Sequence, residues 1–399
     1  MIPRPQAANR IFNAFRVHPI VALLGPRQCG KTTLARMIAG SQPSVYFDLE
    51  NPVDVRRLSV PIKVLEDLSG LVIIDEIQRQ PSLFEILRVL VDRPKKESKF
   101  LILGSASPHL IKGVSESLAG RVGFVDLSGF DLREVGSENH KLLWVRGGFP
   151  RSFLAIDDYA SMTWREDFIR TFLERDIPQF GITIPAETLR RFWTMIAHYH
   201  GQIWNAAEFA RSLGTSENTA RRYLDILAGA YMVRILPPWF ENISKRQVKS
   251  PKVYIRDSGI LHALLQLPTL LDIQGHPKLG TSWEGFALEQ LLTMLECRDA
   301  YFWATHSGAE LDLLVRIGGK RYGFEFKYSD APGYTKSMSV AIQDLKLEYL
   351  WVIYPGKEEY PLSDKCAVLP ENSVPSLVDK ILKREVSVSP SRKAAHQRK

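Results

Sequence analysis

A phosphate-binding loop at residues 25–32 constrains this chain more than any other feature. The loop reads Gly-Pro-Arg-Gln-Cys-Gly-Lys-Thr and fits the pattern G-x-x-x-x-G-K-[ST] at every fixed position. The apolar run 20–24 before it predicts a buried strand, and residues 33–39 after it predict a helix. Glycines let the backbone curl so that its N–H groups point at phosphate oxygens, and the positive end of the helix adds to the anion site. The stretch therefore predicts nucleotide binding.

Two side chains of this loop have expected roles of their own. Lys31 is expected to reach the β- and γ-phosphates of the nucleotide, and the Thr32 hydroxyl is expected to bind Mg²⁺. The residues predicted to surround the nucleotide are Gly25, Pro26, Arg27, Gln28, Cys29, Gly30, Lys31, Thr32 and Thr33.

A second motif follows about 45 residues after the lysine. Residues 71–74 are apolar and are followed by Asp75 and Glu76, which is the Walker B pattern. A parallel strand buried on both faces has to be apolar throughout, and its carboxyl end opens onto the ligand crevice. We expect Asp75 to bind Mg²⁺, directly or through water, and Glu76 to polarise the attacking water.

Two further residues are candidates for nucleotide chemistry. Residues 100–103 predict another buried strand, and Ser105 after it is a candidate sensor of the γ-phosphate; the alternative is that Gly104-Ser105 forms only a turn. Arg121 follows a short predicted helix and could stabilise the transferred phosphoryl group in a neighbouring subunit. A surface arginine or a structural ion pair explains Arg121 equally well.

These motifs resemble the prokaryotic AAA-type ATPases that carry an appended C-terminal domain. The resemblance rests on Gly-Pro-Arg-Gln-Cys-Gly-Lys-Thr-Thr-Leu, Ile-Ile-Asp-Glu-Ile-Gln, Gly-Ser-Ala-Ser and Ser-Leu-Ala-Gly-Arg, and it continues through Gly-Gly-Phe-Pro to about residue 330. It implies ATP binding and hydrolysis. From the motifs themselves we expect Mg²⁺ as a cofactor and a possible homo-oligomer in which Arg121 acts across subunits. Cys29 stands where the family usually has Val or Ala, and we expect it to be a small neutral filler rather than a reactive thiol.

Composition limits the class and the compartment of the protein. A length of 399 residues suits two or three domains with real cores. The formal net charge of +8 permits contact with nucleic acid but does not require it. The three widely spaced cysteines form no metal or disulfide pattern, the N-terminus resembles no signal peptide, and no apolar run is long enough to span a bilayer. We therefore expect a cytoplasmic protein without a membrane partner.

The segment 186–260 has the pattern of a winged helix. A short helix is expected to stop at Gly214, and a second helix, residues 216–231, carries an apolar face. Strands at 233–239 and 252–256 would flank the basic stretch 245–252, whose lysines would contact phosphates. The alternative is a structural spacer or a protein-docking module. The residues predicted to contact DNA are Asn218, Thr219, Arg221, Arg222, Lys245 and Arg246.

Acidic residues near the C-terminal end form a second constellation. A two-residue Gly-Gly turn at 318–319 predicts a hairpin in which Asp312 lies opposite Glu325, with Lys327 on the same face. Opposed carboxylates repel each other, and Mg²⁺ between them would turn this repulsion into a binding site. Glu284 falls on the apolar stripe of a predicted helix and needs a partner there. Leu311, Leu313, Phe324 and Phe326 are expected on the opposite face of the hairpin.

Glu284, Asp312 and the Glu325-x-Lys327 pair resemble the PD-(D/E)xK nuclease core. The resemblance implies Mg²⁺ bound by the three acids and Lys327 at the attacking water or the transition-state charge. An exposed hairpin with alternating salt bridges, or a nuclease fold that has lost activity and only binds, are the alternatives.

The whole chain is therefore expected to be of the α/β class: a P-loop NTPase domain with a parallel sheet, then a winged helix-turn-helix, then a small restriction-endonuclease-like domain. The function expected is ATP hydrolysis coupled to DNA binding and DNA cleavage. The alternative is a signalling ATPase whose C-terminal half binds DNA or a protein without cutting. The expected boundaries are 1–138 for the ATPase core, 139–185 for a helical lid or connector, 186–260 for the winged helix, 261–383 for the nuclease-like domain and 384–399 for a basic disordered tail.

Overall fold

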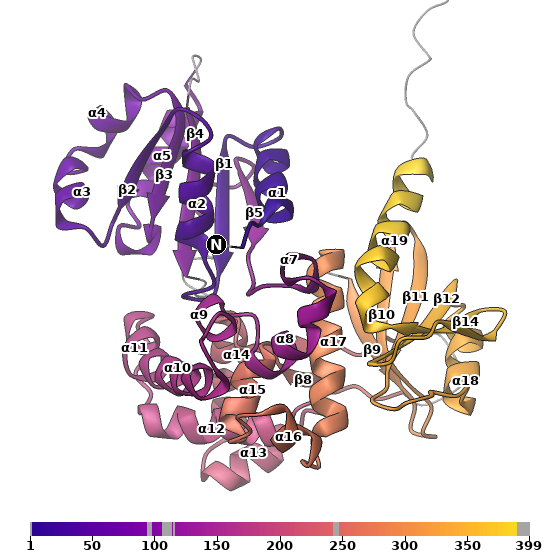
Figure 1. Ribbon diagram of the computed structural model, residues 1–399. Coiled ribbons are helices and arrows are strands. Elements are labelled where there is room, and N and C mark those ends of the chain that lie inside the picture. The colour runs from indigo at the N-terminus through magenta and orange to yellow at the C-terminus, as the bar shows by residue number, and fades with distance from the viewer. Residues whose placement is uncertain are drawn as a thin grey trace, which may run out of the picture.

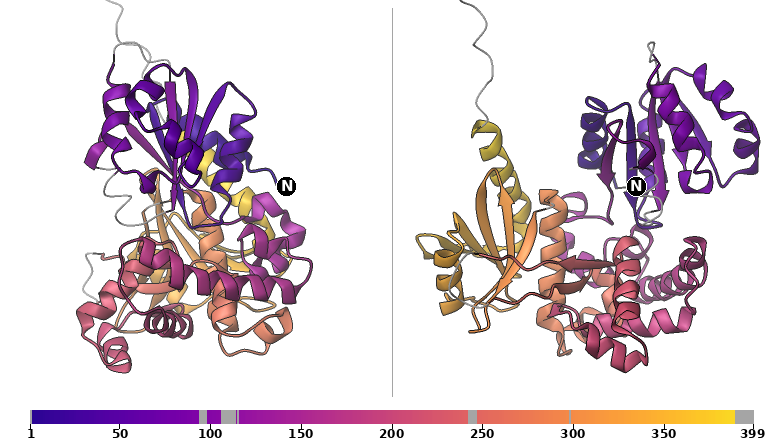
Figure 2. Two further views of the ribbon diagram at one scale, coloured as in Figure 1. Left: turned by 90° about the vertical axis from the view of Figure 1, so that its left-hand side faces the viewer. Right: turned by 180° about the vertical axis from the view of Figure 1, so that it is seen from behind.

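Three sheets and the helices around them make up the protein. The computed structural model describes residues 2–93, 98–105, 114, 116–241, 247–297 and 299–388. The sheets have five, six and three strands. In Figure 1 the five-stranded sheet lies above a helical middle region, and the six-stranded sheet lies to the right. The rear view in Figure 2 has the same separation of the two larger sheets.

The N-terminal sheet is parallel throughout, with strand order β2-β3-β4-β1-β5. Helices α1 and α2 pack against one face and α5 against the other, which is why β1 and β4 are apolar on both faces. This confirms the predicted α/β P-loop NTPase domain. The strands are β1 Ile20–Gly25, β2 Ser44–Asp48, β3 Gly70–Asp75, β4 Ser98–Ser105 and β5 Val122–Asp126. The helices are α1 Pro5–Phe15, α2 Lys31–Ala39, α3 Pro52–Arg57, α4 Pro61–Glu66, η1 Ile77–Arg79 and α5 Leu83–Val91.

The carboxyl ends of these parallel strands meet at one edge of the sheet. Gly25 at the end of β1 is in register with Ser105 at the end of β4, and Asp48 at the end of β2 with Asp75 at the end of β3. Ligands of open parallel sheets bind at this edge. The fold thus brings the phosphate loop and the Walker B strand to one place.

The middle of the chain is mainly helical and contains a small antiparallel sheet of order β6-β8-β7. Its first helices are α7 Leu132–Val135, η2 Ser137–Asn139, α8 His140–Arg146, α9 Pro150–Phe153, α10 Asp158–Thr171, the π-helix η3 Phe172–Asp176 and α11 Ile177–Gln179. The later elements are α12 Ala186–His198, β6 Gln202–Ile203, α13 Ala206–Leu213, α14 Glu217–Gly229, β7 Val233–Leu236, β8 Lys252–Ile255, α15 Ser258–Leu264 and α16 Leu270–Gln274.

Helix α14 has the apolar face that its periodicity predicts. Ser216 is its N-cap rather than its first residue, because the Ser216 side chain accepts a hydrogen bond from the Thr219 N–H. Ala220, Leu224 and Leu227 are buried against the neighbouring helices. The opposite face of α14 is exposed.

The C-terminal part has a mixed six-stranded sheet of order β13-β14-β12-β11-β10-β9. Helices α17 and α19 lie beside each other on one face, as Figure 1 shows, and α18 packs against the other. The elements are α17 Leu279–Leu295, β9 Ala300–Ala304, β10 Glu310–Ile317, β11 Lys320–Phe326, α18 Lys336–Asp344, β12 Tyr349–Tyr354, β13 Tyr360–Ser363, β14 Cys366–Pro370, η4 Glu371–Ser373 and α19 Val374–Val388.

The predicted start of the disordered tail is wrong by about one helical turn. Helix α19 continues through residues 384–388, which the sequence assigns to the tail because they follow the last apolar periodicity. Residues 389–399 of that predicted tail lie outside the described residues. Within the described ranges, no helix combines the length and the apolar character needed to cross a membrane.

Candidate functional site

The phosphate loop has the strained backbone that its glycines predict. Gly30 has φ of 100° and caps α2, a conformation that residues with a Cβ rarely adopt. A Cβ on Gly25 would lie 2.0 Å from the Leu127 carbonyl oxygen, so a larger residue does not fit at this position. The shape of the loop therefore requires glycine at positions 25 and 30.

Lys31 is held inside this loop. Its side chain is buried, and its ammonium donates hydrogen bonds to the carbonyl oxygens of Gly25, at 3.0 Å, and Pro26, at 2.8 Å. The positive charge therefore lies against the loop backbone, at the point toward which the helix N-terminus also faces.

The Walker B carboxylate lies next to the loop. The Thr32 hydroxyl donates to Asp75 Oδ2 at 2.7 Å, and the Tyr46 hydroxyl donates to the same oxygen. The Glu76 N–H donates to Asp75 Oδ1 at 2.9 Å. Burial and this contact with Asp75 raise the pKa of Tyr46, so that it stays a donor. Oxygens of Thr32 and Asp75 are thus close enough together to serve one Mg²⁺ ion, directly or through water.

Glu76 lies directly after the Walker B strand with a left-handed backbone, φ 55°. Its carboxylate accepts a hydrogen bond from the Gln78 amide. Burial raises the pKa of Glu76 above its usual range, and the nearby Lys31 charge opposes that shift. A carboxylate with a raised pKa is better suited to accept a proton from water than an ordinary exposed glutamate.

Ser105 belongs to strand β4, not to a turn. It lies beside Gly25, is buried, and its hydroxyl has no hydrogen-bond partner among the described residues. The position suits a contact with a bound nucleotide, so the γ-phosphate sensor role stays a prediction.

Arg121 lies at the amino-terminal ends of the parallel strands, away from the phosphate loop at their carboxyl ends. It directly precedes β5, whereas the phosphate loop follows the carboxyl end of β1. Its guanidinium forms two hydrogen bonds with Asp92, at 2.7 and 2.8 Å. Arg121 therefore takes no part in the nucleotide site of its own chain, and a role across subunits stays a prediction.

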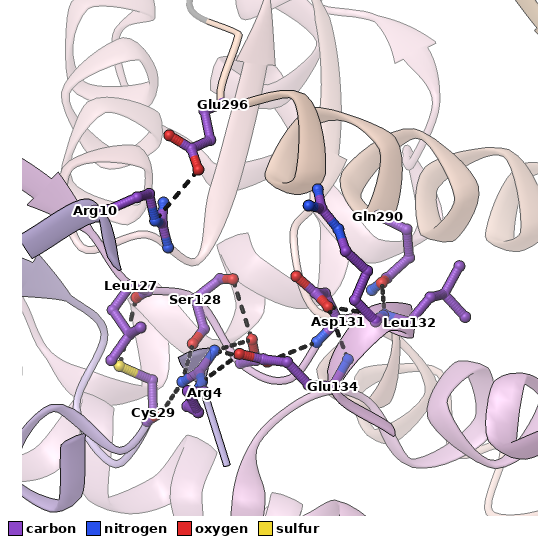
Figure 3. A network of polar contacts seen from close by, with 12 residues as sticks. Arg4, Arg10, Cys29, Leu127, Ser128, Asp131, Leu132, Glu134, Gln290 and Glu296 are labelled. Carbon is purple, nitrogen blue, oxygen red and sulfur yellow. Dashed lines mark hydrogen bonds and ion pairs between the residues drawn. The ribbon is translucent and has the colours of Figure 1, made fainter. Parts of the chain in front are cut away.

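Sequence reasoning made no prediction for Arg4, which connects the phosphate loop to the segment after β5 and to α7. As Figure 3 shows, its guanidinium lies against the loop and the segment after β5. It donates to the carbonyls of Cys29 and Ser128, at 3.0 and 3.1 Å, and pairs with Glu134 at 2.7 Å. Glu134 also belongs to the capping box of α7 with Asp131. A lone arginine near the chain start gives no sequence signal for such a contact.

Cys29 is fully buried in this network. Its thiol lies 3.5 Å from the Leu127 carbonyl oxygen. This is the environment of a filler residue, as expected, because a reactive thiol has to be accessible.

Arg27 connects the phosphate loop to the helical middle region. It forms an ion pair with Asp176 of the π-helix η3, and a second with Glu50 at 3.4 Å. The loop therefore contacts the segment that the sequence predicts to be a lid or connector.

The C-terminal hairpin has the predicted register. Gly318 and Gly319 both have positive φ, and pairing runs from Ile317 with Lys320 to Leu313 with Phe324. The next pair in this register is Asp312 with Glu325. Lys327 lies 2.8 Å from Glu325 and 3.6 Å from Asp312, so all three charged groups meet as predicted.

The apolar residues of the hairpin do not all share a face as predicted. Leu313 packs with Phe324 and Phe326, but Leu311 packs with Leu314 on the α18 side. The pairing of β9 with β10 shifts register between Leu311 and Leu314, and such an irregularity breaks the two-residue alternation.

Lys252 also belongs to this cluster, although the sequence predicts it in the basic stretch that contacts DNA. Its ammonium lies 2.5 Å from Glu310, 3.4 Å from Glu284 and 3.8 Å from Asp312. The prediction that Lys252 contacts DNA phosphates is therefore wrong, since the residue is only 4% exposed. Its apolar neighbours Val253 and Ile255 were the available signal that the stretch is a buried strand.

Burial governs the electrostatics of the acidic cluster. Burial, together with the nearby charge of Asp312, raises the pKa of Glu284 to about 7 and that of Glu325 to about 8. The Tyr254 hydroxyl donates to Glu284 at 2.6 Å. Across the described residues, no group of three or more His, Cys, Asp or Glu side chains is arranged to hold a metal ion. The carboxylates surround ammonium groups instead, so this arrangement does not fit Mg²⁺.

The predicted DNA-contacting residues of α14 lie on its free face. Asn218, Arg221 and Arg222 are exposed, and Thr219 is half-buried with its hydroxyl 2.9 Å from that of Ser216. Arg221 forms a long ion pair with Glu217 at 3.6 Å. The two other predicted residues, Lys245 and Arg246, lie outside the described residues.

Comparison with known proteins assigns the family. The chain is 53% identical over 374 residues to an uncharacterized protein of Mycobacterium tuberculosis, Rv2008c, and equally to Mb2031c of Mycobacterium bovis. Each alignment covers 94% of this chain and 85% of the mycobacterial protein. The chain belongs to the family of these two proteins. An AAA domain matches residues 17–136, and domains of unknown function match residues 137–271 and 279–373.

The AAA match covers the sheet, the phosphate loop and the Walker B strand of this family member. The N-terminal domain is therefore an AAA-type P-loop ATPase domain. Solved structures with partial likeness include a Walker-type ATPase of Pyrococcus abyssi, 15% identical with TM-score 0.46, covering 66% of this chain and 96% of that chain. RuvB of Thermotoga maritima is 19% identical with TM-score 0.29, covering 59% of this chain and 90% of that chain.

Proposed function

We propose that the protein binds ATP with Mg²⁺ and hydrolyses it. The observation that carries this proposal is the contact of Thr32, which follows the phosphate-loop lysine, with the Walker B residue Asp75. Lys31 and the loop N–H groups would hold the phosphates, and Thr32 and Asp75 would hold the metal ion. Mg²⁺ neutralises phosphate charge when it is bound. Glu76 orients the attacking water and accepts its proton.

Glu76→Gln is expected to leave ATP affinity within about twofold and to lower the hydrolysis rate by about 100-fold or more. The amide keeps the size of the side chain but cannot accept a proton from water. Equilibrium ATP binding and phosphate release measured on the same preparation separate the two effects. Glu66→Gln, a carboxylate on α4 away from the site, is the matched control and should change neither. Wild-type hydrolysis by the Glu76→Gln protein would remove the proposed role.

We further propose that the middle region binds DNA through α14. Helices α12, α13 and α14 with the β6-β8-β7 sheet have the order and the antiparallel pairing of a winged helix. A helix that presents Asn218, Arg221 and Arg222 to solvent suits a groove lined by phosphates and base edges. The loop contact between Arg27 and Asp176 would relay nucleotide state toward this region.

Reversing the charge of α14 tests DNA binding. Arg221→Glu together with Arg222→Glu should weaken duplex DNA binding at least about tenfold at low salt, because two phosphate contacts become repulsive. Arg56→Glu, an exposed arginine on α3, is the control. Fluorescence anisotropy with labelled duplex measures both. Equal affinity of all three proteins, or no DNA binding by the wild type, would favour the signalling ATPase whose C-terminal half binds a protein.

For the C-terminal domain we propose a nuclease-like fold. The supporting observation is the meeting of Asp312, Glu325 and Lys327 at the hairpin, with Glu284 reaching the same cluster through Lys252. Cleavage of DNA would require a metal ion among these carboxylates. The Lys252 ammonium lies among these carboxylates, which favours a domain that binds DNA without cutting it.

A further inference from the structure

Lys252 brings a buried positive charge into the C-terminal acidic cluster from a different part of the chain. It lies on β8, within the region matched by the first domain of unknown function, whereas Glu284, Glu310 and Asp312 belong to the second. Its side chain is 6% exposed, compared with 42% for Lys327. The two lysines therefore differ: Lys327 reaches solvent, and Lys252 is enclosed by protein.

The three carboxylates and the aromatic ring recorded around the Lys252 ammonium suit a cation. Three carboxylates approach it, at 2.5, 3.4 and 3.8 Å, and the ring of Phe302 lies 5.6 Å away as a cation–π partner. The Tyr254 hydroxyl, two residues further along β8, donates to the Glu284 oxygen that Lys252 also contacts. These contacts hold the ammonium at the centre of the acidic side chains.

The cluster contains more acidic than basic side chains. Glu284, Glu310, Asp312 and Glu325 contribute four carboxylates, against two ammonium groups from Lys252 and Lys327. Removing Lys252 would leave carboxylates facing one another in a partly buried space, and a hard divalent cation with oxygen ligands relieves that repulsion best.

We propose that the Lys252 ammonium occupies the cation position of this cluster and excludes a divalent metal ion from it. The proposal rests on the nuclease-like assignment of the C-terminal domain. Lys252 is then an autoinhibitory residue: the site can take a metal ion only when β8 withdraws its lysine. Because β8 pairs with β6 and β7, withdrawal of Lys252 would also involve the small sheet next to α14.

Binding of Mn²⁺ to the nucleotide-free full-length chain tests this proposal without relying on activity. Free Mn²⁺ is measured by electron paramagnetic resonance for wild type, Lys252→Met, Asp312→Asn and the double variant Lys252→Met with Asp312→Asn. We expect Lys252→Met to bind one Mn²⁺ at least about tenfold more tightly than wild type, because an ammonium no longer opposes the ion. The Asp312→Asn change should abolish this gain. Lys249→Met, an exposed lysine just before β8, is the matched control and should bind like wild type.

Thermal unfolding gives a second readout. Mn²⁺ should raise the unfolding temperature of Lys252→Met and leave that of wild type unchanged, since only a bound ligand stabilises the folded state. If Lys252→Met does not fold, Lys252→Gln replaces it, because the amide can still donate a hydrogen bond to the carboxylates. Comparing wild type with Asp312→Asn requires neither Lys252 variant. We expect these two proteins to bind Mn²⁺ equally, because the wild-type protein should have no Mn²⁺ binding that depends on Asp312.

Two results would overturn the proposal, and they differ in meaning. Wild-type protein that binds Mn²⁺ as tightly as Lys252→Met, in an Asp312-dependent manner, would remove the role of Lys252 but keep a metal site. A folded Lys252→Met or Lys252→Gln protein without Asp312-dependent binding would show that the cluster does not take a metal ion. That second result would also remove metal-dependent cleavage from the proposed function.

Discussion

Replacing Lys31 by alanine should abolish ATP binding at micromolar concentrations. The ammonium is the loop's own point charge for the β- and γ-phosphates, and it is already positioned by the Gly25 and Pro26 carbonyls. A hydrogen bond from a charged group contributes about 1.5–3 kcal/mol. Losing two such bonds from Lys31 to the phosphates corresponds to a fall in ATP affinity of at least about a hundredfold. Isothermal titration with ATP and Mg²⁺ measures the loss.

Lys63→Ala, an exposed lysine on α4, is the control for the Lys31 experiment. It should bind ATP like wild type. Circular dichroism should give the same helix content for wild type, Lys31→Ala and Lys63→Ala, because the hydrogen bonds recorded for Lys31 go to the loop backbone. ATP affinity of Lys31→Ala within threefold of wild type would contradict the proposed nucleotide site.

Arg4→Ala should destabilise the N-terminal domain by about 3–5 kcal/mol, the usual cost of leaving one member of a buried ion pair without its partner. The Arg4 and Glu134 side chains are 7% and 4% exposed. The same change removes the donors to the Cys29 and Ser128 carbonyls, so ATP affinity should fall as well. Guanidinium unfolding monitored by circular dichroism, with and without ATP, measures both effects.

Arg10→Ala provides the contrast for Arg4→Ala. Arg10 pairs with Glu296 at 3.4 Å, but these side chains are 25% and 50% exposed. Figure 3 shows this pair apart from the contacts of Arg4. An exposed pair contributes at most about 1 kcal/mol. An unfolding midpoint of Arg4→Ala no lower than that of Arg10→Ala would mean that Arg4 does not fasten the loop.

The sequence was sufficient for the parts of the molecule that depend on short-range pattern. The phosphate loop could be predicted because its backbone shape demands glycines at positions 25 and 30, and the Walker B strand because a buried parallel strand is apolar on both faces. The hairpin register followed from the Gly318-Gly319 turn alone, since a two-residue turn determines which residues pair.

Contacts between distant segments could not be predicted in the same way. Arg4 lies 130 residues from Glu134, and Lys252 lies 60 residues from Asp312, so no local periodicity relates the partners. The register shift beside Leu311 also depends on β9, a neighbouring strand, and not on the hairpin itself. Lys252 was therefore predicted to contact DNA from the wing, although in the fold its side chain points into a buried cluster of carboxylates.

These contacts offer a physical route between the nucleotide site and the C-terminal domain. The segment that pairs with Arg4 continues into α7, where the Leu132 N–H donates to Gln290 of α17 at 2.9 Å. Helix α17 also carries Glu284, a partner of Lys252. The phosphate loop and the acidic cluster are therefore connected through the Arg4 contacts, α7 and α17.

The most direct test of the central claim is phosphate release from ATP by the purified wild-type chain in the presence of Mg²⁺, with Lys31→Ala as the blank. The nucleotide site described above predicts many turnovers per chain, at a rate at least about tenfold above that blank. ATP that binds to the wild-type protein without any phosphate release above the blank would contradict hydrolysis. The N-terminal domain would then be a nucleotide-binding switch and not an enzyme.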